Sequence, residues 1–78
     1  MPAELSTEAI LLKRLQYGDY DLILTLLTQS HGKLSVIAKS AKKSIKRFGG
    51  VLELFSGLNI TCATGRGRLP LLKEATLY

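Results

Sequence analysis

Residues 22–39, LILTLLTQSHGKLSVIAK, decide the fold. Over residues 34–39 the side chains alternate: Leu, Val and Ala point one way and Ser, Ile and Lys the other, as in a half-buried strand. Leu22–Thr28 contains several β-branched residues, which favour a second strand, although its leucines leave a helix open. Ser30–Lys33 holds a glycine and is short enough for a hairpin loop. The stretch therefore predicts two antiparallel strands, with Lys39 on the second face of the later one.

Three more strands are expected outside this hairpin. Upstream, Ala9–Leu15 is a short apolar run that fits a strand, with a helix as the alternative. Downstream, Val51–Ala63 alternates most strongly, and Ser56 and Gly57 predict a bulge or sharp bend within it. The final run, Leu69–Tyr78, is expected to be a strand that begins at a sheet edge, because its second residue is a proline.

Between the third and fourth strands, the basic residues of Ser40–Arg47 recur at helical spacing. This segment is predicted to be either a short helix, with Ser40 as a possible N-cap, or a mobile basic hairpin. Five strands with one short helix between strands 3 and 4 predict a mainly β fold, a five-stranded Greek-key OB-fold barrel. An SH3-like barrel is the nearest alternative, and a sandwich of two sheets is a further one.

The composition indicates one small cytosolic domain. The chain has 78 residues, of which 46% are hydrophobic, so a core is possible in a single domain spanning residues 1–78. Cys62 is the sole cysteine, which excludes an intrachain disulfide and a site of several thiolates; its position among apolar residues predicts a small core side chain. No apolar run approaches the roughly 18 residues of a membrane span. The first ten residues lack the pattern of a secretory signal, so we expect a cytoplasmic protein without membrane contact.

The charge distribution predicts a polyanionic partner. The formal net charge is +5, and His31–Gly50 holds six of the eleven basic residues and no acid. Lysines and arginines that meet phosphates release condensed counterions, which drives nucleic-acid binding without sequence preference. The alternative is a solvated face that only aids solubility. The basic residues of this segment are Lys33, Lys39, Lys42, Lys43, Lys46 and Arg47.

Several other side chains could extend such a surface. Phe48 directly follows the basic segment and could stack on a base, or it could anchor the loop in the core. Tyr17 and Tyr20 flank a glycine turn and could also stack. Arg66 and Arg68 stand in a GRGR turn, where they could enter a minor groove or form an ordinary exposed tip.

Nothing in the sequence indicates catalysis. His31 is the only histidine and stands beside a glycine, so it is expected to be a turn residue. Asp19 and Asp21 are expected to form a turn rather than to hold a cation. The chain has no phosphate-cradling GxxxxGK loop. We therefore expect a non-enzymatic protein without a cofactor or metal.

The order of these motifs resembles the amino-terminal domain of the RecO family of bacterial DNA repair proteins. That family has a strand of the form "ivlk", a "yGE.D" turn and a later "HGk.s..akGar…s.sRfgg.L.pf" pattern. Here Asp19 stands where the family usually has glutamate. Ser40 stands where glycine is frequent, which argues against a tight turn after the third strand. The resemblance covers nearly the whole chain and includes Leu12, Lys13, Tyr17, Gly18, Asp21, Thr25, Leu26, Thr28, His31, Gly32, Lys33, Ala38, Lys39, Ser44, Arg47, Phe48, Gly49, Gly50, Leu52 and Phe55.

The resemblance implies an OB fold and the binding and annealing of single- and double-stranded DNA in the bacterial nucleoid. It also implies a role in loading RecA onto single strands coated with SSB, with RecR and SSB as partners. Members of the family are considerably longer, so this chain is expected to be their amino-terminal fragment. The residues expected to bind DNA are Lys33, Lys39, Lys42, Lys43, Lys46, Arg47, Phe48, Arg66 and Arg68.

Two other functions fit the same residues. A protein-interaction barrel could capture an acidic peptide tail on its basic face. An RNA-binding barrel of the OB or SH3-like type would need the same phosphate contacts.

Overall fold

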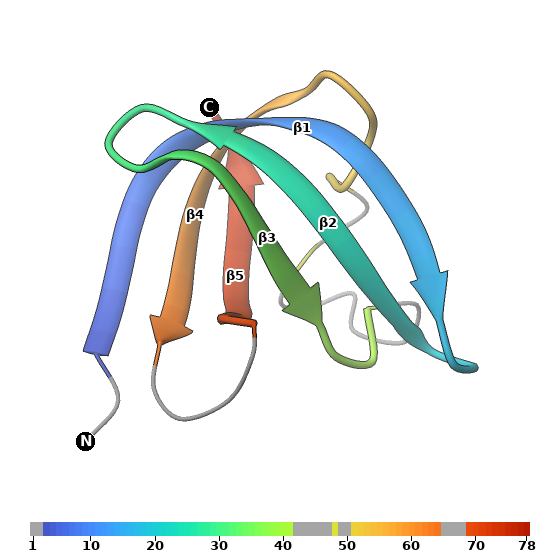
Figure 1. Cartoon of the computed structure of the whole chain (residues 1–78). Helices are drawn as coiled ribbons and strands as arrows, with labels where there is room; N and C mark the ends of the chain where they lie inside the picture. Colours follow the sequence, from blue (N-terminus) through green and yellow to red (C-terminus); the bar gives the residue numbers. More distant parts are fainter. Residues whose placement is uncertain (1–2, 42–47, 49–50, 65–68) are drawn as a thin grey trace.

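A computed structural model gives the positions of residues 3–41, 48, 51–64 and 69–78. The chain folds into a closed barrel with the strand order β1-β2-β3-β5-β4 (Figure 1). This confirms the predicted five-stranded OB-type barrel. The strands are β1 (Ala3–Tyr17), β2 (Asp21–Thr28), β3 (Gly32–Ala38), β4 (Gly57–Thr64) and β5 (Leu71–Leu77).

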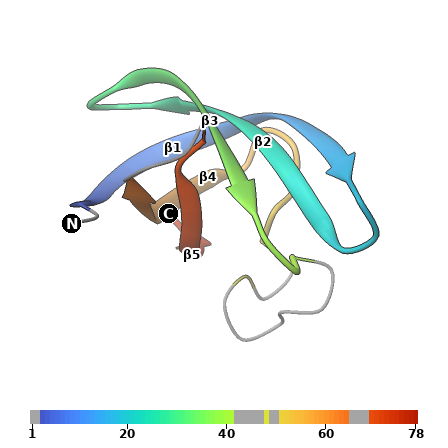
Figure 2. The same cartoon turned by 60° about the horizontal axis from the view of Figure 1, so that its bottom comes forward.

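The long strand β1 closes the barrel by serving two neighbours. Its residues 3–10 pair with β4 and its residues 9–17 pair with β2, both antiparallel. The views show β1 curving round the barrel between these two partners (Figure 1, Figure 2). The register shifts between Leu11 and Lys13, and such a bulge bends the strand and increases its twist. The curvature of β1 therefore comes from a local irregularity in the middle of the strand.

The barrel is completed by a short parallel contact between β3 and β5, where Ile37 pairs with Leu71. The amide of Ile37 donates a hydrogen bond to the carbonyl oxygen of Pro70 at 2.9 Å. Pro70 precedes β5 and contributes only its carbonyl group, because proline has no amide hydrogen. The last strand is confirmed, but the prediction that it begins at a sheet edge is wrong, because the barrel is closed and the carbonyl group of Pro70 is bonded to β3.

Alternate side chains of the strands fill the barrel. On β2 every second residue from Leu22 to Thr28 is buried, as expected for a strand with one face in the core. Cys62 is fully buried, which confirms the prediction of a small core residue. The largest fully buried side chains are Leu11, Leu24, Leu26, Val36, Leu58, Ile60, Cys62 and Leu72.

The predicted strand over Val51–Ala63 is wrong in its first half. Residues 51–56 do not belong to a strand, and β4 begins at Gly57, where a bend was expected. Phe55 has a positive φ of 68°, and its amide donates a hydrogen bond to the carbonyl oxygen of Leu11 at 2.6 Å. The segment is held against β1 by this bond and by one from the amide of Leu11 to the carbonyl oxygen of Ser56, at 3.2 Å. Leu52 is buried and Leu54 is exposed, so the alternating leucines do not share one face as they would in a strand.

The predicted helix over Ser40–Arg47 falls mainly on residues 42–47, which lie outside the described residues. Ser40 itself has a φ of +56°, which is a left-handed conformation and not the extended one of an N-cap. The N-cap prediction is therefore wrong. A turn over Lys39–Ala41 forms even though Ser40 occupies a position that favours glycine.

Within the described residues, no helix is long and apolar enough to cross a membrane.

Candidate nucleic-acid interface

The outer face of β1, β2 and β3 carries lysines on a partly apolar surface. Lys13 lies opposite Thr25, and Thr25 lies opposite Ser35 on β3. Lys33 lies opposite Leu27, which is itself exposed. Thr25 and Ser35 point away from the core, because their neighbours on β2 and β3 point inward. Lys13 and Lys33 are exposed and pair with outward-facing residues of β2. Lys39 directly follows β3 and is exposed, so the described part of the face carries three lysines.

The outer face on the other side of the barrel is acidic. Glu8 lies opposite Asn59 on β4, and Glu74 on β5 lies opposite Thr61. Glu4 shares the parity of Glu8 along β1 and is exposed. The sequence has six acidic residues, and half of them are these three glutamates. A polyanion approaching the barrel would be repelled on this face.

Two ion pairs engage basic side chains other than the three lysines of the β1–β2–β3 face. Lys73 Nζ on β5 lies 2.6 Å from Glu4 Oε2, and this hydrogen-bonded carboxylate raises the pKa of Lys73. Arg14 lies on the strand position opposite Leu24, and its guanidinium is 4.0 Å from the carboxylate of Glu53. Both cations are thus placed next to carboxylates of their own chain. Lys13 and Arg14 are adjacent in β1, and only Lys13 pairs with an outward-facing residue of β2, so Lys13 shares the face of Lys33 and Lys39.

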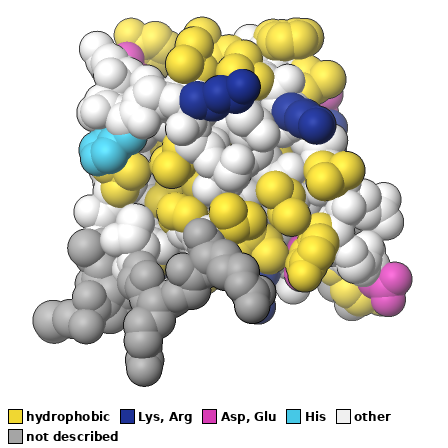
Figure 3. Space-filling view, in the orientation of Figure 1, with side chains coloured by type: hydrophobic (Ala, Val, Ile, Leu, Met, Phe, Trp, Pro, Cys, Tyr) yellow, Lys and Arg dark blue, Asp and Glu magenta, His cyan; other side chains and the backbone are white. Residues whose placement is uncertain are grey.

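On the face shown in Figure 3, positively charged side chains lie above a group of hydrophobic ones, and acidic side chains are seen mainly toward the edges. The exposed hydrophobic residues of the β1–β2–β3 face include Ile10, Leu15, Tyr17 and Leu27, each between 43% and 54% exposed. Aliphatic and aromatic surface beside lysines can contact the sugar and base parts of a nucleic acid, while the lysines meet phosphates.

The role predicted for Phe48 needs correction. Its side chain is 3% exposed and belongs to the hydrophobic core. A ring buried in the barrel cannot stack on a base, so the alternative interpretation, an anchor for the loop, describes its position. Tyr17 at the end of β1 and Tyr20 in the turn that follows, by contrast, are 54% and 47% exposed and remain candidates for stacking.

Of the predicted DNA-binding residues, Lys33 and Lys39 lie on or beside the outer face of β3. The others, Lys42, Lys43, Lys46, Arg47, Arg66 and Arg68, lie outside the described residues.

Lys13 belongs to the candidate face but was not among the predicted site residues. Its position depends on the bulge between Leu11 and Lys13, which shifts the register by one residue. A bulge has no fixed sequence signal, so alternation alone could not decide between Lys13 and Arg14.

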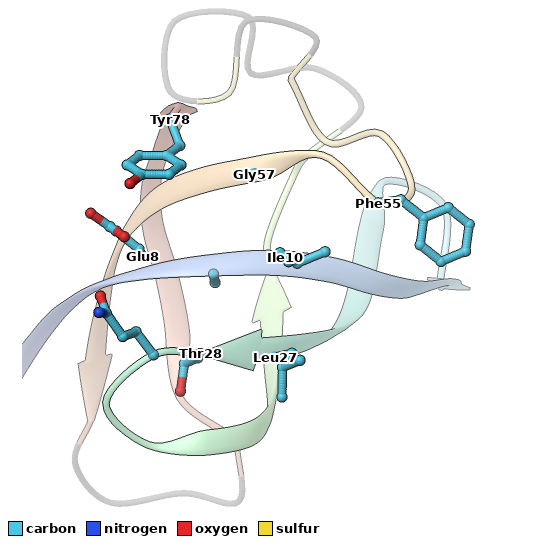
Figure 4. Close-up of a pocket in the computed structure, with 9 residues that line it drawn as sticks. Glu8, Ile10, Leu27, Thr28, Phe55, Gly57 and Tyr78 are labelled. Carbon is cyan, nitrogen blue, oxygen red and sulfur yellow. The ribbon is translucent and has the colours of Figure 1, made fainter.

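An apolar pocket of about 380 Å³ lies next to this face (Figure 4). Ile10 and Leu27 line it together with Phe55 and Tyr78, and Glu8 supplies a carboxylate. Its lining contains no lysine or arginine, so we assign it no phosphate contact. Ile10 and Leu27 connect it to the apolar part of the β1–β2–β3 face.

The described residues include side chains that can ligate metals or react, namely Cys62, His31 and the carboxylates. They contain no cluster of three or more His, Cys, Asp or Glu side chains that could hold a metal ion. Burial raises the pKa of the Cys62 thiol to about 11, so the thiol stays protonated and unreactive near neutral pH. His31 lies in the β2–β3 turn, where its amide donates to Thr28 Oγ1 at 2.9 Å and Nδ1 is 2.7 Å from Ser30 Oγ. This matches the prediction of a turn residue.

A closed five-stranded barrel with a basic outer face defines a small OB-fold domain, a class that includes many binders of oligonucleotides. Comparison with known proteins is more specific. Residues 1–78 match the family described as "Recombination protein O N terminal". The chain belongs to this RecO amino-terminal family.

Relatives in three bacteria share the name DNA repair protein RecO. The protein of Desulfatibacillum aliphaticivorans is 53% identical over 74 residues, covering 92% of this chain and 29% of the relative. That of Desulfosudis oleivorans is 45% identical over 74 residues, covering 92% and 28%. That of Myxococcus xanthus is 43% identical over 60 residues, covering 77% and 25%. The chain thus spans less than a third of the length of the relatives it matches.

Proposed function

We propose that this chain is the DNA-binding domain of a recombination mediator, without catalytic activity of its own. It holds DNA strands by their phosphates on the outer face of β1, β2 and β3, and on the basic segment that follows β3 in the sequence. By binding two strands it promotes their annealing. In the longer protein it contributes to loading RecA onto single strands coated with SSB, with RecR and SSB as partners.

The separation of charge between the two faces carries this proposal. Lys13, Lys33 and Lys39 lie on or beside the β1–β2–β3 face, whereas Glu4, Glu8 and Glu74 lie on the β1–β4–β5 face. Such a separation orients a polyanion toward one side of the barrel. The family's relatives are named as DNA repair proteins, which makes DNA the polyanion to test first.

Annealing follows from the same electrostatics. Two single strands repel each other through their phosphates, and a cationic surface that contacts both lowers this repulsion. Phosphate contacts carry no sequence information, so complementary strands could still select each other by base pairing.

The salt dependence of binding tests the proposal. We expect log Kd to rise linearly with log salt concentration for a labelled single strand and for a duplex. Lys33→Gln should weaken binding and lower the slope by about 0.7 on the single strand and about 0.9 on the duplex, the change for one lost phosphate contact. Fluorescence anisotropy at four or more salt concentrations gives both numbers.

Lys73→Gln is the matched control, because it removes the same charge from the face where Lys73 is paired with Glu4. It should leave both affinity and slope close to those of the unmodified chain. Equal effects of the two substitutions would show that net charge alone, and not the β1–β2–β3 face, governs binding. A slope near zero for the unmodified chain would contradict the electrostatic mechanism.

A further inference from the structure

One row of paired residues crosses four strands of the barrel at the apolar pocket. Ile10 on β1 pairs with Gly57 on β4 on one side and with Leu27 on β2 on the other. Leu27 in turn pairs with Lys33 on β3. Ile10, Leu27 and Gly57 line the pocket. Because neighbouring strands lie about 4.8 Å apart, the pocket and one lysine of the candidate interface are side by side on the same surface.

Two exposed aromatic rings bound this pocket. Phe55 and Tyr78 lie toward opposite ends of it, with Ile10 and Leu27 between them (Figure 4). Phe55 is 72% exposed and Tyr78 is 76% exposed, the highest values among the described large hydrophobic residues. An aromatic side chain left in water adds little to the stability of the barrel, because the hydrophobic effect requires burial. The rings are therefore accessible to a ligand that enters the pocket.

The backbone at Phe55 keeps its ring on the surface. Its φ of +68° is a left-handed conformation that residues with a side chain seldom adopt. The hydrogen bond from its amide to the carbonyl oxygen of Leu11, at 2.6 Å, holds the residue in this conformation. Backbone strain that the surrounding structure maintains is concentrated at functional sites. A role in binding a ligand accounts for strain that presents a large apolar ring to water.

The pocket and the lysine beside it fit an unpaired nucleotide. Apolar walls suit the flat faces of a base, and every base can stack on an aromatic ring. The volume of about 380 Å³ lies within the range of about 300–1,000 Å³ that is typical of small-molecule sites. Glu8, the acidic side chain of the lining, can accept a hydrogen bond from a base amino group but repels a phosphate. The phosphate of the same nucleotide is therefore placed at Lys33, beyond Leu27 in the row.

We propose that this pocket binds an unpaired base of a single strand, stacked against the ring of Phe55, while Lys33 holds an adjacent phosphate. The inference rests on the proposed function and adds to it a contact that single strands make and duplexes do not. In a duplex the bases are paired and stacked within the helix, so entering the pocket requires that they first unpair. The competing occupant of such an apolar patch is protein, including a second copy of this chain.

Phe55→Asn tests the stacking contact. Asparagine tolerates the left-handed conformation, so this change removes the ring and keeps the backbone. Leu54→Asn is the matched control, because Leu54 is an exposed apolar residue one position earlier that does not line the pocket. Fluorescence anisotropy at neutral pH compares three labelled probes of equal length: an oligo(dC) strand, a strand in which every base is replaced by an abasic site, and a duplex.

The unmodified chain should bind oligo(dC) about five- to a hundred-fold more tightly than the abasic strand, the factor expected for one stacked base. Phe55→Asn should lose most of this factor on oligo(dC), and it should bind the abasic strand and the duplex as the unmodified chain does. Leu54→Asn should leave all three affinities unchanged. Thermal unfolding shows whether each variant is folded. If Phe55→Asn does not fold, Leu27→Thr takes its place, because it removes apolar surface from the pocket and suits a strand.

Equal affinity of the unmodified chain for oligo(dC) and for the abasic strand overturns the inference, while salt-dependent binding of both leaves the proposed function standing. Equal losses in Phe55→Asn and Leu54→Asn, or a loss in Phe55→Asn that extends to the abasic strand, also overturn the inference. Analytical ultracentrifugation tests the competing occupant: a dimer without DNA that Phe55→Asn converts to a monomer assigns the pocket to a second copy and overturns the inference. If the unmodified chain binds none of the probes, the proposed function fails and the inference fails with it.

Discussion

At the scale of single residues, three positions in the turns show how conformation depends on partners. Gly18 and Gly32 have φ values of +71° and +63°, in turns that their neighbouring sequence predicted. Ser40 takes up a similar conformation, yet nothing near it in the sequence indicates this. Its support comes from Asp21, a residue 19 positions earlier that becomes a neighbour only when β2 and β3 pair.

Ser40→Gly is expected to stabilise the domain. Glycine has no Cβ, so it removes the steric cost of the left-handed conformation, which is about 1–2 kcal/mol. It adds about 0.5–1 kcal/mol of backbone entropy lost on folding. The amide that donates to Asp21 is kept. The melting temperature should therefore rise by a few degrees, since about 1 kcal/mol shifts a domain of this size by about 4–8 °C. Differential scanning calorimetry measures this change.

Gly32→Ala is the opposite control. A Cβ at Gly32 would meet no atom within 4 Å, so any loss of stability must come from the backbone conformation and not from a clash. Its melting temperature should fall. A fall for Ser40→Gly as well would mean that the serine side chain contributes more than its conformation costs.

At the scale of elements, alternation and turn residues were enough to predict five strands, but not all of their limits. β2 and β3 agree with their predicted ranges to within two residues, because a hairpin with one buried face has a strong two-residue period. β1 spans Ala3–Tyr17, well beyond the predicted Ala9–Leu15. Its first half was not predicted, because polar residues there interrupt the apolar run. Residues 51–56 alternate like a strand although they form a turn, held by hydrogen bonds to Leu11 that no local pattern reveals.

The candidate site was predictable to a smaller extent. Charge counting led to the basic residues of β3, but burial of Phe48 and the outward direction of Lys13 depend on how distant segments pack. The acidic face needed the pairing of β1 with β4 and of β4 with β5, which brings together glutamates from positions 4, 8 and 74.

The closing strand β5 offers a test at this scale. Leu72 is fully buried, whereas Leu77 on the same strand is 63% exposed. Leu72→Ala should lower the free energy of unfolding by about 2–5 kcal/mol through lost burial and a cavity in the core. For so small a domain that is most of its stability, so the variant should be largely unfolded well below the melting temperature of the unmodified chain.

Leu77→Ala makes the same change in an exposed position and should shift the urea midpoint only slightly. Urea denaturation followed by circular dichroism compares the two variants. Similar losses for both would contradict the assignment of β5 as the strand whose buried side chains complete the core.

At the scale of the whole molecule, the barrel separates two kinds of surface. One side presents lysines next to exposed aliphatic and tyrosine side chains, and the other presents glutamates among serine, threonine and asparagine. The core is one cluster of buried side chains, and the charged residues of the two outer faces are not part of it. Function can therefore be changed on one face without loss of the barrel.

The most direct test of the central claim is to titrate the ¹⁵N-labelled chain with a short single strand and to follow its amide resonances by NMR. The account predicts that the largest shifts occur around Lys13, Lys33 and Lys39 on or beside the β1–β2–β3 face, and that the amides of Glu4, Glu8 and Glu74 change little. Shifts concentrated on the β1–β4–β5 face, or spread evenly over both faces, would contradict it.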